Sequence, residues 1–294
     1  MSTFVLLTIT GLGLGAMYFL IASGLSLIYG LMGVLNFAHG AFLTVGAYGA
    51  WFAESKLAGV SVLPRFLLGA LAGLVVGGVF AALVELVLIR PLYKRHIEQV
   101  LVTVGLALAV SALVVAIWGN DARPFTAPSW LGRTTSVAGA HIPNDRWVEI
   151  ATALVVLVAL NAFLRRTRYG LIIRAGVENR AMVTALGIDV RRAFTLVFAI
   201  GGAAAALAGA LGGVYTGAIS PTGGSSLLIF GFIVVVIGGM GSVTGAAYAA
   251  VAVGLLQQFV NYTSSGLGDI CVVALLAVVL LVRPQGITGK VATS

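Results

Sequence analysis

The chain has 294 residues, of which 60% are hydrophobic and 9% are charged, and its net charge is +8. No Asp, Glu, Lys or Arg occurs between Met1 and Ala53 or between Ala193 and Gly268. Because a soluble domain presents charged and polar groups to water over its whole surface, this pattern excludes a soluble protein and predicts an integral membrane protein.

Apolar segments separated by polar or glycine-rich breaks predict an all-α fold, a polytopic transmembrane helical bundle of eight or nine spans. Nothing in the sequence marks a soluble domain, so residues 1–294 are expected to form a single integral membrane domain. The seventh candidate span is too short to cross a bilayer without tilting. The candidates are Phe4–Tyr29, Phe37–Ala53, Phe66–Ile89, Val100–Trp118, Val148–Leu164, Phe194–Tyr215, Ser225–Ile237, Val243–Tyr262 and Ile270–Val282.

Basic residues gather beside particular spans. Arg90, Lys94 and Arg95 follow the third span, seven arginines lie within residues 165–192, and Arg283 and Lys290 follow the last span. Since Lys and Arg accumulate in cytoplasmic loops, these segments are predicted to be cytoplasmic and residues 119–147 to be an external loop. With these loops in the cytoplasm, nine spans place the N-terminus outside. If one short segment is re-entrant, eight spans place the N-terminus inside.

Each uncharged part of the chain contains a polar break between apolar segments. The breaks are residues 33–40, which include Asn36 and His39, and residues 220–225. Interrupted helices at matching places in two halves are typical of transporters with internal repeats. Two unrelated breaks that match by coincidence are the alternative explanation. Asn36 and His39 either line a translocation path or bond the backbone groups that the break exposes.

Glycines recur at intervals of four residues in several predicted helices. Glycines with this spacing lie on one helix face and allow two backbones to approach closely. They are therefore predicted to pack helices together, and the longest series are Gly69, Gly73 and Gly77 and then Gly209, Gly213 and Gly217.

A few polar side chains interrupt the apolar spans. Gln257, Gln258 and Asn261 form a polar patch in the eighth span, which predicts either bonds between helices or a water-filled path. Glu85 lies five residues before Arg90. It is expected to be a partly solvated carboxylate near the membrane interface.

Motifs for independent chemistry are missing from the sequence. There is no phosphate-binding loop, no zinc-protease motif and no nucleophile elbow. The single His39 in the first break offers no metal site. The chain is therefore expected to be no enzyme and to hold no metal or cofactor, so any energy for active transport would come from another subunit.

The arginine-rich segment 165–192 contains one stretch that favours a helix. Ala175–Leu186 is rich in helix-forming residues, and Gly187 is suited to end such a helix. A short cytoplasmic helix between two spans could dock on a partner, while a solvated loop that only sets the topology fits the charge pattern equally well.

Five segments of the chain, taken together, resemble the permeases of branched-chain amino acid transporters of the ATP-binding-cassette (ABC) type. They occur in the family's order and extend from the first span to the C-terminal tail. The segments are residues 30–40 (GLMGVLNFAHG), 85–91 (ELVLIRP), 174–188 (RAGVENRAMVTALGI), 236–246 (VIGGMGSVTGA) and 283–286 (RPQG).

This resemblance implies a bacterial inner-membrane importer. A periplasmic binding protein would deliver the substrate to two permease subunits, and two cytoplasmic ATPases would use ATP to drive transport. The family pattern assigns Glu178 and Gly187, with Arg174 and Asn179 in the same segment, to a coupling loop that fits a groove on the ATPase. Asn179 and Arg180 stand where other importers usually have two alanines.

The sequence is compatible with more than one substrate and more than one mode of transport. Branched-chain amino acids or related small amino acids and amides are the expected cargo, and urea or aromatic acids are alternatives within the ABC class. A passive channel or a self-sufficient secondary carrier is the rival from another class. The predicted path residues are Asn36, His39, Gln257 and Asn261, and the path is expected to lie at the interface with a second permease subunit.

Overall fold

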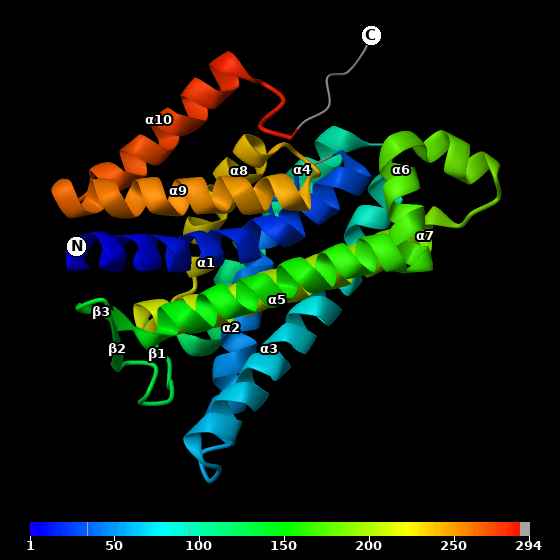
Figure 1. Ribbon diagram of the computed structural model, residues 1–294. Coiled ribbons are helices and arrows are strands. Elements are labelled where there is room, and N and C mark those ends of the chain that lie inside the picture. Colours follow the sequence, from blue (N-terminus) through cyan, green and yellow to red (C-terminus); the bar gives the residue numbers. More distant parts are fainter. Residues whose placement is uncertain (34, 94, 289–294) are drawn as a thin grey trace.

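The computed structural model describes residues 1–33, 35–93 and 95–288, with all their side chains except those of residues 31 and 177–181. Within these residues the chain is mostly helical, and each of the nine predicted spans coincides with a helix (Figure 1). The long helices are α1 (Ser2–Met32), α2 (His39–Lys56), α3 (Val62–Val84), α4 (His96–Trp118), α5 (Asn144–Arg166), α6 (Arg168–Ala185), α7 (Val190–Thr216), α8 (Gly223–Gly238), α9 (Val243–Thr263) and α10 (Leu267–Val282).

Among the described helices, six are long and apolar enough to cross a membrane. They are α1, α3 with the turns that follow it, α4, α5, α7 and α9. The turns after α3 are a π-helical segment, η1 (Glu85–Ile89), and a 3-10 turn, η2 (Arg90–Leu92). α8 and α10 are shorter apolar helices of 16 residues each. The chain is therefore an integral membrane protein.

The two ends of the bundle carry different structures. α6 and the start of α7 lie at one end, and the N-terminus lies at the other end beside the loop that precedes α5 (Figure 1). That loop is shorter and more ordered than the predicted 119–147, because α5 begins at Asn144 and two short antiparallel sheets form. β1 (Arg123–Pro124) pairs with β4 (Ala218–Ile219), and β2 (Thr134–Val137) pairs with β3 (Ala140–Pro143).

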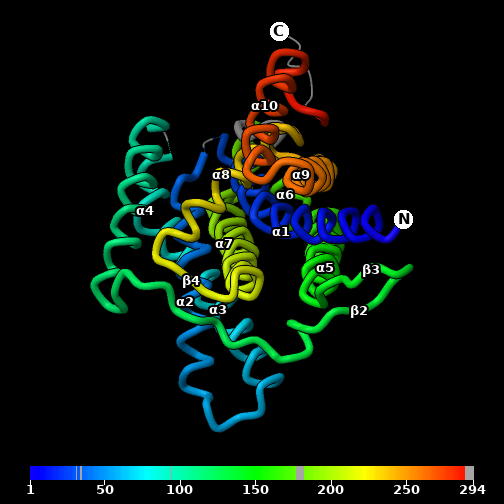
Figure 2. The backbone as a smooth tube through the Cα atoms, turned by 90° about the vertical axis from the view of Figure 1, so that its left-hand side faces the viewer, coloured from blue at the N-terminus to red at the C-terminus, as the bar shows by residue number. Residues whose placement is uncertain are grey.

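α1 and α7 form the centre of the bundle. α1 packs against α9, α7, α5 and α8, while α7 also packs against α2 and α3. α4 lies at the flank, away from α1, α5 and α9 (Figure 2), and its exposed apolar side chains include Ile97, Leu101, Val104, Leu108, Leu113 and Ile117. Because apolar side chains on a membrane protein can face lipid tails, this flank is suited to contact lipid or a neighbouring subunit.

Small residues permit the close contacts at this centre. A Cβ atom built on Gly201 of α7 would lie 2.9 Å from the carbonyl oxygen of Gly24 on α1, and one built on Gly15 of α1 would lie 2.7 Å from that of Ala250 on α9. These separations leave no room for a side chain, so the backbones themselves are in contact. In lipid, such packing is a main source of association energy between helices.

The two predicted glycine series pack against neighbouring helices, except for the last glycine of the second series. Gly69 and Gly73 of α3 lie against α2, where a Cβ atom on Gly73 would be 2.9 Å from the Ala50 Cβ, and Gly77 lies against Ala206 of α7. Gly209 packs on the backbone of Leu43 in α2, and Gly213 packs on Ile219 and Phe125. Gly217 does not pack as predicted, because it lies beyond the last residue of α7 and a Cβ there would meet nothing within 4 Å.

Both breaks begin at a glycine in the left-handed conformation, and the second one covers residues 217–222, three residues earlier than the predicted 220–225. α1 ends at Gly33 with φ 69°, and α7 ends at Gly217 with φ 74°. This conformation ends a helix at little cost only for glycine and a few other residues. α2 then begins at His39 and α8 at Gly223, so the two breaks, residues 33–38 and 217–222, have the same length.

Replacement of Gly77 by Val should destabilise the protein, because the added side chain would overlap Ala206 where α3 meets α7. Overpacking of this kind costs about 1–3 kcal/mol, and it should lower the midpoint of thermal unfolding in detergent by several degrees. Gly105→Val is the matched control, since a Cβ on Gly105 of α4 would meet nothing within 4 Å. Equal midpoints for the two variants would contradict the close α3–α7 contact.

Candidate translocation site

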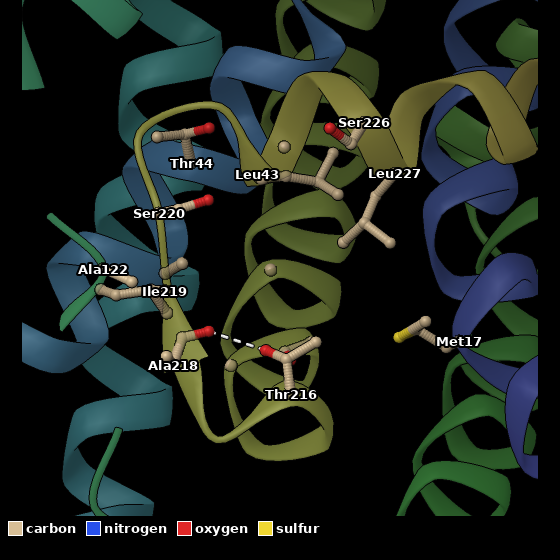
Figure 3. Close-up of a pocket in the computed structure, with 16 residues that line it drawn as sticks. Met17, Leu43, Thr44, Ala122, Thr216, Ala218, Ile219, Ser220, Ser226 and Leu227 are labelled. Atoms are coloured by element: carbon tan, nitrogen blue, oxygen red, sulfur yellow. Dashed lines mark hydrogen bonds between the residues drawn. The ribbon is translucent and has the colours of Figure 1, made fainter. Parts of the chain in front are cut away.

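A cavity of about 380 Å³ lies between the central helices and the second break. We call it the outer cavity, because its wall includes β4 and the residue before β1, which belongs to the segment predicted to be external (Figure 3). Its wall comes from α1, α2, α7, α8 and the segments between them: Met17, Leu43, Thr44, Ala47, Ala122, Gly209, Gly212, Gly213, Thr216, Ala218, Ile219, Ser220, Gly223, Gly224, Ser226 and Leu227.

Local sequence explains why this space is empty. Five of the wall residues are glycines, which occupy the wall without filling it with side chains. The end of α7 is fixed by Thr216, whose hydroxyl donates to the carbonyl oxygens of Gly212 at 2.8 Å and of Ala218 at 2.7 Å (Figure 3). Ala218 and Ile219 are then held by the pairing of β4 with β1. The second break therefore forms a fixed wall of the cavity.

The outer cavity is uncharged. Within the described residues its lining contains no ionisable side chain, and its polar groups are the hydroxyls of Thr44, Thr216, Ser220 and Ser226 together with backbone groups. Met17, Leu43 and Leu227 supply apolar surface. Such a lining suits a small solute that has no net charge and carries both polar and aliphatic parts.

A second, more open cavity, also of about 380 Å³, lies at the surface beside the first break. We call it the inner cavity. It is lined by Tyr29, Gly33, Leu35, Phe37, His96, Ile97, Val100 and Met240, which come from the end of α1, the break itself, the start of α4 and the turn after α8. The two predicted breaks thus border separate cavities, one beside each.

Asn36 and His39 hold the first break together. The Asn36 side-chain oxygen accepts a hydrogen bond from the Ala38 backbone N–H at 3.1 Å, and Nε2 of His39 lies 3.0 Å from the carbonyl oxygen of Ile21 in α1. Asn36 is 3% exposed and His39 is fully buried. These bonds fit the backbone-bonding alternative, and neither residue lines the outer or the inner cavity. Their predicted role in a path stays a prediction.

Gln257 and Asn261 join helices at the outer end of α9. Gln257 accepts from the Tyr18 hydroxyl at 2.7 Å and donates to the Asp269 carboxylate at 2.6 Å, so it links α1, α9 and α10. Asn261 accepts from the Gly268 N–H at 3.0 Å, at the start of α10. Neither side chain lines the outer or the inner cavity. Their role in a path also stays a prediction.

Glu85 is more deeply buried than its sequence position suggested. It is fully buried rather than partly solvated, and Arg90 pairs with it at 3.2 Å. Thr195 of α7 donates to the same carboxylate at 2.7 Å and accepts from Arg90 at 2.8 Å. Tyr93 also donates to Glu85, and burial raises the pKa of the Tyr93 hydroxyl. The π-helical turn and α7 together shield the carboxylate, a contact between distant segments that sequence spacing does not reveal.

Sequence reasoning missed a second buried ion pair at the outer end of the bundle. Arg146 contacts the carboxylates of Glu149 at 3.2 Å and Asp145 at 3.6 Å, and Glu149 is 2% exposed. The Arg146 guanidinium lies 3.7 Å from the ring centre of Tyr215 in α7. The spacing of three residues between Arg146 and Glu149 on one helix was the available signal.

The segment predicted to be cytoplasmic forms a longer helix than expected. α6 begins at Arg168, not Ala175, because the Thr167 hydroxyl accepts from the Gly170 N–H at 2.9 Å and caps the helix. It ends at Ala185 and Gly187 follows with φ 76°. The Gly187 and Ile188 N–H groups bond the carbonyls of Thr184 and Val183, as in a Schellman motif. The side chains of Glu178 and Asn179 lie outside the described residues.

Comparisons with known proteins identify the family. Residues 7–282 match the family model described as the permease component of the branched-chain amino acid transport system. The chain belongs to this family. It is 31% identical over 290 residues to the high-affinity branched-chain amino acid transport permease LivH of Escherichia coli (strain K12), which covers 95% of this chain and 94% of LivH.

Two further relatives show the breadth of the similarity. The permease BraD of Pseudomonas aeruginosa is 31% identical over 292 residues, covering 96% of this chain and 94% of BraD. The fructose import permease FruF of Bifidobacterium longum is 28% identical, covering 93% of this chain and 75% of FruF. No solved structure matches the chain.

A leucine at Gly212 should block the outer cavity while leaving the bundle intact. The Cβ position there meets only the Leu227 side chain, at 3.3 Å, so a larger group would extend into the cavity. We expect uptake by the assembled transporter to fall at least tenfold while the unfolding midpoint stays near that of the unmodified protein. Gly59→Leu, in the turn before α3, is the control because its Cβ position is open. Unchanged uptake by Gly212→Leu would contradict the assignment of this cavity.

Proposed function

We propose that this chain is a permease subunit of an ABC importer for branched-chain amino acids or related small amino acids and amides. The observation that carries the proposal is the family match over residues 7–282. The uncharged outer cavity supports it, because an amino acid is a zwitterion with no net charge. Its hydroxyls can bond the amino and carboxylate groups, and Met17, Leu43 and Leu227 can contact an aliphatic side chain.

Transport by this subunit would depend on partners. The sequence has no phosphate-binding loop, so ATP would be bound and hydrolysed by two cytoplasmic ATPase subunits. A second permease subunit would complete the path, and a periplasmic binding protein would deliver the substrate. The chain itself would be no enzyme, would hold no cofactor and would reside in the bacterial inner membrane, where lipid surrounds it. No role in binding nucleic acid is proposed.

α6 is the proposed contact with the ATPase. One face of this helix packs on the bundle through Ile173 and Val183, which are 2% and 4% exposed. Leu186 and Ile188 at its end are exposed, and so is Arg174. A helix that exposes an apolar end and, farther back, a positive charge, at the end of the bundle away from β2 and β3, is suited to bind a cytoplasmic protein.

Replacement of Gly187 by Val should uncouple ATP hydrolysis from transport. The glycine has φ 76°, a conformation that a β-branched residue adopts only with strain. We expect the binding protein to stimulate the ATPase several-fold less in the Gly187→Val transporter. Gly187→Asn is the control, since asparagine tolerates this conformation and should retain most of the stimulation. Equal stimulation by the two variants would contradict a role for the end of α6.

We propose nine membrane crossings with the N-terminus outside. The N-terminus and α6 lie at opposite ends of the bundle (Figure 1), and the arginines of residues 165–192 favour the cytoplasm. α2, at 18 residues, and α8, at 16, are about 27 and 24 Å long. They would cross with the help of the breaks that precede them. The equal length of the two breaks supports the proposed internal repeat.

Cysteine labelling tests this topology. In a Cys271→Ala background, a membrane-impermeant maleimide should label Thr135→Cys, in the β2–β3 hairpin, on intact cells. It should label Arg174→Cys, on α6, only after the membrane is permeabilised. Labelling of Arg174→Cys in intact cells would overturn the orientation.

Reconstitution separates the proposal from its rivals. The purified chain in liposomes should take up no leucine alone, and uptake should require the ATPases, ATP and the binding protein. Uptake by the chain alone would favour a channel or a secondary carrier. The affinities of the binding protein for leucine, urea, amides, aromatic acids and fructose would identify the cargo.

A further inference from the structure

We propose that the contact between α2 and α8 is the closed gate of the translocation route, with Phe37 and Phe232 as its plug. The inference rests on the proposed function and extends it to particular residues. Phe37 is the last residue but one before α2, and Phe232 lies in the middle of α8. Their ring centres are 5.2 Å apart.

The first argument is the position of the contact between the two cavities. α2 borders the outer cavity at Leu43, Thr44 and Ala47, while Phe37 just before it borders the inner cavity. α8 borders the outer cavity at its start, from Gly223 to Leu227, and Met240 just beyond its end borders the inner one. α2 therefore runs from the inner cavity to the outer cavity, and α8 runs from the outer cavity to the inner cavity. The contact between the two helices lies between the two cavities.

The second argument is that this contact is closed. A Cβ atom on Gly40 would lie 3.1 Å from the Gly224 carbonyl oxygen and 3.2 Å from the Ser225 Cα, so the two backbones touch. Residues 38–42 of the chain are all buried. Beyond this point Phe37 packs on Phe232, so a backbone contact and a ring pair both lie between the outer and the inner cavity.

The third argument is that the contact can separate at low cost. Among the described residues, no hydrogen bond or ion pair joins α2 to α8; the contact consists of backbone, small side chains and rings. Some other contacts in the bundle are held by polar bonds. Gln257 ties α1 to α9 and α10, and Glu85 with Arg90 ties the end of α3 to Thr195 of α7.

This difference decides where movement is expected. Separation of α2 from α8 would break no polar bond, whereas movement of α3 from the start of α7 would break the bonds that Thr195 makes to the buried Glu85 carboxylate and to Arg90, which is costly. A shift transmitted from α6 through α7 would therefore open the α2–α8 contact more easily than the contact between the end of α3 and α7. Phe37 and Phe232 would part, and the two cavities would become one route past apolar rings and hydroxyls.

Cross-linking tests the gate in the complete transporter. In a Cys271→Ala background, Phe37→Cys and Phe232→Cys are combined and joined by a short bifunctional thiosulfonate. We expect the cross-link to form in the nucleotide-free complex, to lower leucine uptake at least tenfold, and to be reversed by a reducing agent. Phe4→Cys with Phe259→Cys is the control, because those rings are 5.6 Å apart on α1 and α9 and do not lie between the cavities. Its cross-link should leave uptake unchanged.

The outcomes separate the gate from the function. If the cross-linked Phe37–Phe232 pair transports as well as its reduced form, or if the pair does not cross-link, the gate is wrong while the proposed function stands. If the Cys271→Ala complex without further changes takes up no leucine, the proposed function itself fails. A Phe37→Ala, Phe232→Ala variant adds a second readout, since it should leak leucine without ATP at several times the rate of the unmodified complex.

Discussion

Backbone contact between helices is the interaction on which the rest of this structure depends. α1 touches α7 at Gly24 and Gly201, and touches α9 at Gly15 and Ala250. Lipid tails are as apolar as the helices, so burial of apolar surface gives little reason for helices to associate, and close packing has to supply it. Small residues at the contacts allow that packing and bring α2, α7 and α8 close together around the outer cavity.

The same small residues explain why the bundle contains empty space. A wall made of glycine occupies little volume, and the outer cavity lies where glycines of α7 and α8 face Leu43 and Thr44 of α2. Side chains that bond across helices lie away from this region. The Gln257 link is toward the outer end of α9, and the Glu85 cluster is at the end of α3. These polar bonds thus hold the ends of the helices together, and the described lining of the outer cavity between them contains no charged side chain that would bind tightly to a solute.

Buried charges in this protein stabilise the ends of the bundle. Glu85 with Arg90, and Glu149 with Arg146, are ion pairs in which the carboxylate is almost completely inaccessible. Removal of one partner from such a pair is far more costly than its presence is favourable. Each pair also contacts one end of α7. Glu85 accepts a hydrogen bond from Thr195 near the start of α7, and Arg146 lies over the ring of Tyr215 near its end.

The sequence alone determined the membrane location, the apolar helices and the first break, because these depend on local composition: apolar runs give spans, and Gly33 and Gly187 end helices through their own backbone freedom. It placed the second break three residues too late. It could not place Glu85, which spacing suggested was partly solvated, because its burial depends on Thr195 and Tyr93 packed around it. It also assigned Gly217 to a packing face, although that residue lies past the end of α7. The outer cavity and the α2–α8 contact were decided only in three dimensions, since their walls come from segments more than a hundred residues apart that meet through tertiary packing.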